Sequence, residues 1–220
     1  IGIEIQLCNC RFIDTPLYDS VYRSRGGTGA GRRVVDPISD LTAEHEAVRT
    51  TLEVLWRIGR EIEGSGTIVQ GADIDHLLEF FAVFVDRCHH GKEEKVLFPA
   101  LRETGADPEG GLLDQLLDEH QKGRVLVREM ASALERYRKE GTASEATRFV
   151  RAAGAYGDLL AAHVEREDRR LFPVIEQSLS SEALSSVQQG FDRIETEEVG
   201  AGKHEAFHRM LDDLGARYPG

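Results

Sequence analysis

Two short segments of the sequence carry histidine and glutamate at the same spacing. The first runs from His89 to Pro99 and the second from His163 to Pro173, and each reads His-x-x-x-Glu with a Leu-Phe-Pro tail. Corresponding residues are 74 positions apart. Residues four apart on a helix present their side chains together. Each segment therefore offers an imidazole and a carboxylate on one helix face, which together can bind a metal ion.

The repeat extends upstream, where Glu44-His45 and Glu119-His120 lie 75 residues apart. If the two halves fold together, four imidazoles and two carboxylates converge. Burying so many ionisable groups without a cation would cost much free energy. A metal site is therefore favoured over hydrogen-bonded core histidines. The expected ligands are His45, His89, Glu93, His120, His163 and Glu167.

The elements that must position these residues are helices. From Asp40 onward, apolar residues recur at steps of three and four. Further helices are expected from about residue 73, over 112–141 and from about 142 to about Pro173, with shorter pieces over 181–196 and 202–217. The predicted fold class is all-α, an antiparallel up-down-up-down four-helix bundle with short extra C-terminal helices. Pro99 and Pro173 are expected to bend or end their helices.

Three segments are predicted from composition and pattern: a flexible N-terminal arm over 1–37, the bundle over 38–180, and a C-terminal helical extension over 181–220 that packs on the bundle. The net charge of −12 argues against binding to nucleic acid. No apolar run is long enough to span a membrane, and three cysteines favour a reducing cytoplasm. Cys8 and Cys10 are interpreted as free thiols. The sequence does not predict the oligomeric state.

The motif order His45, His89-x-x-x-Glu93, His120, His163-x-x-x-Glu167, with both Leu-Phe-Pro tails, resembles the hemerythrin-like (HHE cation-binding) family over about residues 38–180. The resemblance implies two non-haem iron ions with an oxo or carboxylate bridge, and manganese or zinc remain alternatives. It makes the four histidines iron ligands and the two glutamates bridging carboxylates.

The resemblance also implies a function, the binding or sensing of O₂, peroxide or NO, so a small diatomic ligand or peroxide is the expected partner. Two alternatives stay open. One is a di-iron enzyme of the peroxidase or oxidase type, and the other is an iron-storage or interaction module. Whether the chain is an enzyme is left undecided by the sequence.

One ligand of the oxygen-carrying members is missing. They have a second histidine four residues after the position of His120, and here that residue is Arg124. His204 and His208, on one face of a C-terminal helix, are candidate replacements and are included among the expected metal ligands. His90 is a third candidate, but neighbours on a helix point about 100° apart. An outer or surface position is therefore favoured for His90.

Several further residues are assigned supporting roles. Glu44 and Glu119 are expected to accept hydrogen bonds from metal-bound imidazoles. Asp168 stands five residues after His163, where the oxygen-carrying members use an aspartate. Gly123 would leave space for a small diatomic ligand, and Tyr156 would donate a hydrogen bond to a bound oxygen species.

Overall fold

The structure is a computed structural model, and it describes residues 36–106, 110–200 and 203–218. These residues belong to one unit of the chain, Val35–Gly220. The expectations for the N-terminal arm and for Cys8 and Cys10 lie outside the described residues. Over the described ranges every regular element is a helix, so the fold class is all-α. None of the helices in this part of the chain has the length and apolar character needed to cross a membrane.

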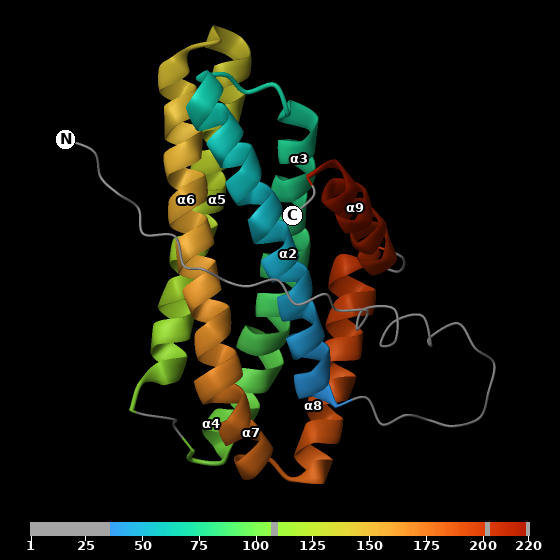
Figure 1. The fold of residues 1–220 in the computed structure, drawn as a ribbon. Helices are drawn as coiled ribbons and strands as arrows, with labels where there is room; N and C mark the ends of the chain where they lie inside the picture. The colour runs from blue at the N-terminus through green and yellow to red at the C-terminus, as the bar shows by residue number, and fades with distance from the viewer. Residues whose placement is uncertain (1–35, 107–109, 201–202, 219–220) are drawn as a thin grey trace. The chain divides into compact units, whose positions relative to one another are not determined.

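The labelled helices α2, α3, α5 and α6 belong to long helical rods that lie side by side (Figure 1). The first is α2 (Pro37–Ser65), and the third is α5 (Leu112–Glu140). The second joins α3 (Gly71–Glu79), the π-helical segments η2 (Phe80–His90) and η3 (Glu93–Leu97), and α4 (Phe98–Glu103). The fourth joins α6 (Ala143–Arg166), the π-helical segment η4 (Glu167–Leu171) and α7 (Phe172–Ser178). The remaining elements are α8 (Ser181–Arg193), the π-helical segment η5 (Ile194–Val199) and α9 (Lys203–Arg217).

Local sequence explains where the first rod begins and ends. The side chain of Asp36 accepts a hydrogen bond from the Ile38 N–H at 3.3 Å, and Pro37 occupies the first helical turn. An aspartate cap followed by proline is a strong start signal, so α2 begins three residues before the predicted Asp40. Gly66 ends the helix in a left-handed conformation, with φ of 68°.

Pro99 and Pro173 do not end their helices, which corrects one of the two outcomes expected of them. Each proline follows a π-helical segment, η3 or η4, and the helix continues as α4 or α7. The Phe98 N–H bonds to the Glu93 carbonyl, five residues back, and the Phe172 N–H bonds to the Glu167 carbonyl. The wider turn accommodates a residue without an N–H.

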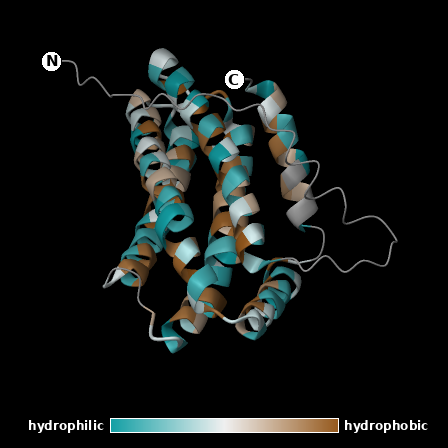
Figure 2. Cartoon of the chain, turned by 60° about the horizontal axis from the view of Figure 1, so that its bottom comes forward, coloured by the Kyte–Doolittle hydropathy of each residue, from teal (hydrophilic) through white to brown (hydrophobic). Residues whose placement is uncertain are grey.

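The apolar core is divided into two clusters. On α2, Leu41 belongs to one cluster and Ala47 to the other, while the buried polar residues Glu44 and His45 lie between them. The C-terminal helices contribute to both clusters: Phe191 of α8 joins the first and Phe207 of α9 joins the second. Figure 2 shows the matching alternation of hydrophobic and hydrophilic residues along the helices. The core therefore encloses a polar layer.

Candidate metal centre

The polar layer holds two adjacent groups of ligand atoms. Within each group the nitrogen and carboxylate oxygen atoms all lie within 4.8 Å of one another, and every residue is buried. The two-imidazole group is His45, His89, Glu93 and Glu167, and the three-imidazole group is His90, Glu93, His120 and His163. Glu93 belongs to both groups. The structure thus brings together six of the eight residues expected to bind metal.

Glu167 faces both groups as well. Its Oε2 atom lies 3.2 Å from the Nε2 atom of His45, and its Oε1 atom lies 3.1 Å from the Nε2 atom of His163. Glu93 also faces both groups: its Oε1 atom lies 3.8 Å from Nε2 of His89, and its Oε2 atom lies 3.4 Å from Nε2 of His120. Each carboxylate therefore presents one oxygen to each group, which is the arrangement of a bridging ligand.

A carboxylate lies behind each of the four repeated histidines. The Nδ1 pairings are His45 with Asp168 at 2.7 Å, His89 with Glu44 at 2.9 Å, His120 with Glu94 at 2.8 Å, and His163 with Glu119 at 2.9 Å. A carboxylate that accepts a hydrogen bond from Nδ1–H keeps the proton on Nδ1, so the lone pair on Nε2 points away from the carboxylate. The four lone pairs therefore point into the centre. Glu44 and Glu119 play the part expected of them, and Glu94 is an addition.

The inward atoms form a donor set that requires a cation. The Nε2 atoms of His45 and His89 are 3.2 Å apart, as are those of His120 and His163. Neither oxygen of Glu93 or Glu167 has a hydrogen-bond partner, although all four atoms are buried. Such groups are costly unless they are paired or bind a metal. Imidazole nitrogen with carboxylate oxygen suits iron, manganese and zinc.

The two bridging carboxyls differ in acidity although they are equally buried. Burial raises the pKa of Glu93, and the charge of Glu167 beside it raises the pKa further, to well above the usual range. Burial also opposes ionisation of Glu167, but the charge of His163 beside it outweighs burial and holds that pKa well below its usual range. A cation in the centre would favour the charged form of both.

A cationic side chain pairs with each of the four carboxylates that lie behind the repeated histidines. The pairs are Arg49 with Asp168, Lys92 with Glu44 at 2.5 Å, Arg124 with Glu94 at 2.7 Å, and Arg166 with Glu119 at 2.7 Å. Arg49 and Arg124 are 75 residues apart, and Lys92 and Arg166 are 74 apart. The duplicated sequence therefore repeats the outer cations as well as the ligands. Arg124 thus supports a ligand from the place where a further histidine was expected.

Lys92 is fully enclosed, with a side-chain exposure of 0%. Its Nζ atom lies 2.5 Å from Glu44 and 2.5 Å from Glu195 of η5. Glu44, Glu195 and Cys88 are close enough to hold an ion, but the ammonium group already supplies the positive charge there. The C-terminal extension is thereby tied to a residue behind the centre.

His90 does not lie at the surface, which was one of the two positions favoured for it. Its exposed fraction is 4%, and its ring stacks on that of His120 with the centroids 3.8 Å apart. The reason is the position of Glu93, which lies four residues after His89 and three after His90. Both spacings place side chains on one helix face, so the two imidazoles flank the shared carboxylate. His90 thus supplies the fifth imidazole.

The side chains of His204 and His208 lie outside the described residues, so their assignment as ligands remains a prediction. The sequence identified the repeated phenylalanines of the two Leu-Phe-Pro tails but assigned them no role. Phe172 stacks on His45 at 5.3 Å, and Phe98 stacks on His120 at 6.1 Å. The shared offset of 74 indicated that the two rings have equivalent positions, and their stacking on the histidines is seen only in the structure.

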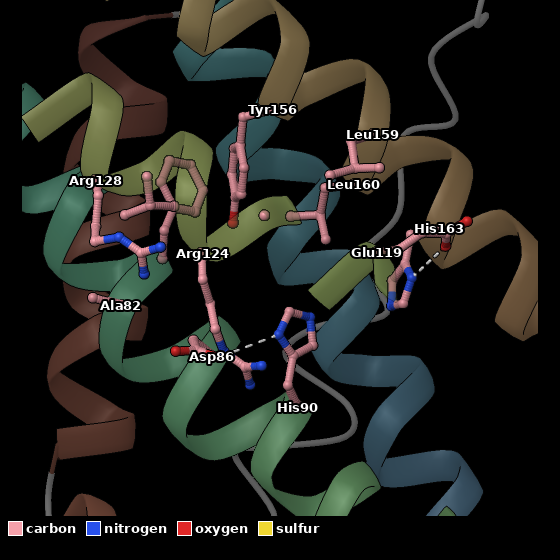
Figure 3. A pocket seen from close by; sticks show the side chains of 13 residues that line it. Ala82, Asp86, His90, Glu119, Arg124, Arg128, Tyr156, Leu159, Leu160 and His163 are labelled. Atoms are coloured by element: carbon pink, nitrogen blue, oxygen red, sulfur yellow. Dashed lines mark hydrogen bonds and ion pairs between the residues drawn. The ribbon is translucent and has the colours of Figure 1, made fainter. Parts of the chain in front are cut away.

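A cavity of about 150 Å³ opens beside the three-imidazole group. It is enclosed by η2, α5 and α6, and its lining is Phe81, Ala82, Asp86, His90, Glu119, Gly123, Arg124, Val127, Arg128, Tyr156, Leu159, Leu160 and His163. Figure 3 shows His90 and Tyr156 pointing into this space from opposite sides. The cavity contains the two residues, Gly123 and Tyr156, that the sequence assigned to a small ligand.

Comparison with known families matches residues 36–175 to the hemerythrin HHE cation binding domain. A search of curated proteins found no match, and neither did a search of solved structures. The matched range covers more than half of the chain and includes every residue of both ligand groups. His204 and His208 lie outside the matched range. The chain belongs to the hemerythrin HHE cation-binding domain family.

Proposed function

We propose that this is a non-haem di-iron protein that binds or senses O₂, peroxide or NO. The observation that carries the proposal is the pair of ligand groups that share Glu93 and Glu167. Two carboxylates that each face both groups favour two ions over one. Iron in such a site can bind or reduce small oxygen-derived ligands.

The residues of this chain have separable roles in the proposal. Five imidazoles and two carboxylates hold the ions, and a carboxylate behind each repeated histidine fixes its orientation. The two apolar clusters exclude water from above and below. The antiparallel up-down-up-down bundle and a cytoplasmic location, expected from the helix pattern and the cysteine content, are part of the same proposal.

Metal analysis of the protein purified from iron-supplemented cells tests the proposal. We expect about two iron ions per chain and an absorption spectrum that differs between aerobic and anaerobic samples. Far less than two metal ions per chain, together with no charge-transfer absorption from ferric iron, would sink it. Two ions of zinc or manganese would keep the site and reject iron.

An enzyme that consumes peroxide is the second candidate, and the cavity beside His90 and His163 favours it. Turnover of peroxide by the iron-loaded protein, and its loss in Glu93→Ala, would support this reading. A stable and reversible spectral change with O₂, without turnover, would count against it.

A further inference from the structure

Gly123 lines the cavity beside the three-imidazole group and has no side chain to occupy it. Glycine within a helix is less favourable than alanine, and Gly123 lies inside helix α5. A Cβ atom there would meet only Tyr156, at an ordinary 3.6 Å. The residue 75 positions earlier in the repeat is Val48, which is fully buried. The duplicated chain therefore places a buried valine on one side where it places a glycine on the other.

The polar groups without partners at this cavity are hydrogen-bond donors. Neither ring nitrogen of His90 has a hydrogen-bond partner. Its Nδ1 atom lies 3.6 Å from Asp86, whose oxygen already accepts from Arg124 at 2.6 Å. Each of the other four ligand histidines has a carboxylate within 2.9 Å of Nδ1. With Nε2 turned to the centre, the Nδ1–H of His90 is left for a ligand.

Tyr156 supplies a second donor. Its exposed fraction is 2%, its ring packs on Phe81 at 4.7 Å, and its hydroxyl points into the cavity in Figure 3. No hydrogen bond of this hydroxyl is recorded within the described ranges. Buried hydroxyls normally have a partner. Both oxygens of the nearby Glu119 already accept hydrogen bonds, from His163 and Arg166.

The cavity is larger than a diatomic molecule needs, and part of its lining is apolar. Phe81, Val127 and Leu160 form that apolar part, and the charged side chains of the lining are Asp86, Glu119, Arg124 and Arg128. A cavity of about 150 Å³ with aliphatic and aromatic walls can hold benzene. A fitting ligand therefore combines an oxygen acceptor with a short carbon body.

We propose that this cavity binds a small organic hydroperoxide. Its oxygen atoms accept hydrogen bonds from Tyr156 and His90, and its carbon substituent lies against the apolar lining. The inference rests on the proposed function, because a peroxide would be consumed here only if the adjacent centre holds iron. Beyond the proposed function, the cavity assigns the ligand to the three-imidazole side and identifies the ligand as an organic hydroperoxide.

The probe is tert-butyl hydroperoxide, added to the full chain loaded with zinc, which undergoes no redox change. Ligand-detected NMR measures binding. We expect saturable binding to the wild type, a loss of about threefold to tenfold in Tyr156→Phe from the missing hydrogen bond, and a graded loss from Gly123→Ala to Gly123→Val. Gly154→Ala is the matched control, because that helical glycine has nothing within 4 Å of an added Cβ.

Equal affinity in the wild type, Gly123→Val and Tyr156→Phe would overturn the inference. Tighter binding of benzoate than of the hydroperoxide would also overturn it, because the cavity would then be a carboxylate site. Iron content, measured separately on the same wild-type chain, keeps the two claims apart. Two iron ions per chain without probe binding would refute only the hydroperoxide site, whereas absence of iron would refute the proposed function.

Discussion

The two sides of the metal centre are built from one duplicated pattern and depart from it in opposite directions. The three-imidazole side gains His90 where the repeat has Val164, and it gains space where Gly123 replaces Val48. The two-imidazole side keeps both valines, which are buried, and behind it Lys92 is fully buried. The difference teaches that duplication provides the ligands, while departures from it decide where a ligand can enter and where the scaffold is rigid.

The largest effect should come from the residue that both sides share. Glu93→Leu removes a bridging carboxylate, so we expect both ions to be lost, with affinity falling by more than the roughly 10–100-fold typical of residues behind a ligand. The metal-free protein should instead gain about 1–3 kcal/mol in unfolding free energy, because two unpaired buried oxygens disappear. Metal analysis and urea denaturation check the two signs.

The control for this variant is Glu53→Leu, which alters an exposed glutamate on α2. It should leave metal content unchanged. A Glu93→Leu protein that kept one tightly bound ion would show that the carboxylate serves one side only.

The next effect should be confined to one side. His90→Val copies the residue of the other half, Val164, and leaves two imidazoles on each side. We expect the ion on that side to bind at least about tenfold more weakly, by comparison with losses seen for residues behind a ligand, and the other ion to change little. Calorimetric titration of the metal-free protein with zinc resolves the two steps. Unchanged titration would make His90 a packing residue.

A third comparison separates the cations behind the two sides. Lys92→Met leaves the carboxylate of Glu44 buried without its cation, which should cost about 3–5 kcal/mol of unfolding free energy. Arg166→Met removes a side chain that is 21% exposed, and the expected cost is about 1 kcal/mol or less. Chemical denaturation of the metal-free proteins measures both. Restoring stability in Lys92→Met by adding Glu44→Gln would show that the unpaired charge is the cause, and equal costs would contradict the comparison.

Much of the centre could be predicted from the sequence because a fixed offset and a helical spacing are both visible there. The convergence of the six repeated His and Glu residues, and the places of Glu44 and Glu119 behind two of the histidines, follow from those two regularities. The surface position predicted for His90 follows from a single helical stripe through His89. On the helix, however, Glu93 is within one turn of both histidines, and it belongs to the group of each. Departures from a repeat carry no signal of their own.

The long helices could also be predicted from the sequence, but their π-helical segments could not. Apolar spacing predicted the long rods, but the π-helical segments η3 and η4 depend on how a proline is accommodated inside a packed helix. The enclosure of Lys92 also depends on η5, which approaches from far along the chain through Glu195. Tertiary contacts of this kind have no local pattern.

The smallest effect tests whether the open side is a packing defect or a retained space. Gly123→Ala should raise the unfolding free energy by about 0.5–1 kcal/mol, because alanine favours the helix and its Cβ meets Tyr156 at an ordinary 3.6 Å. Gly157→Ala, one helix away, should lose stability, because its Cβ would lie 2.4 Å from Nε1 of Trp56. Urea denaturation of both metal-free variants measures the contrast. A stability loss in Gly123→Ala would mean that packing requires the glycine. A gain would mean that the chain gives up stability at this position and keeps a cavity beside His90.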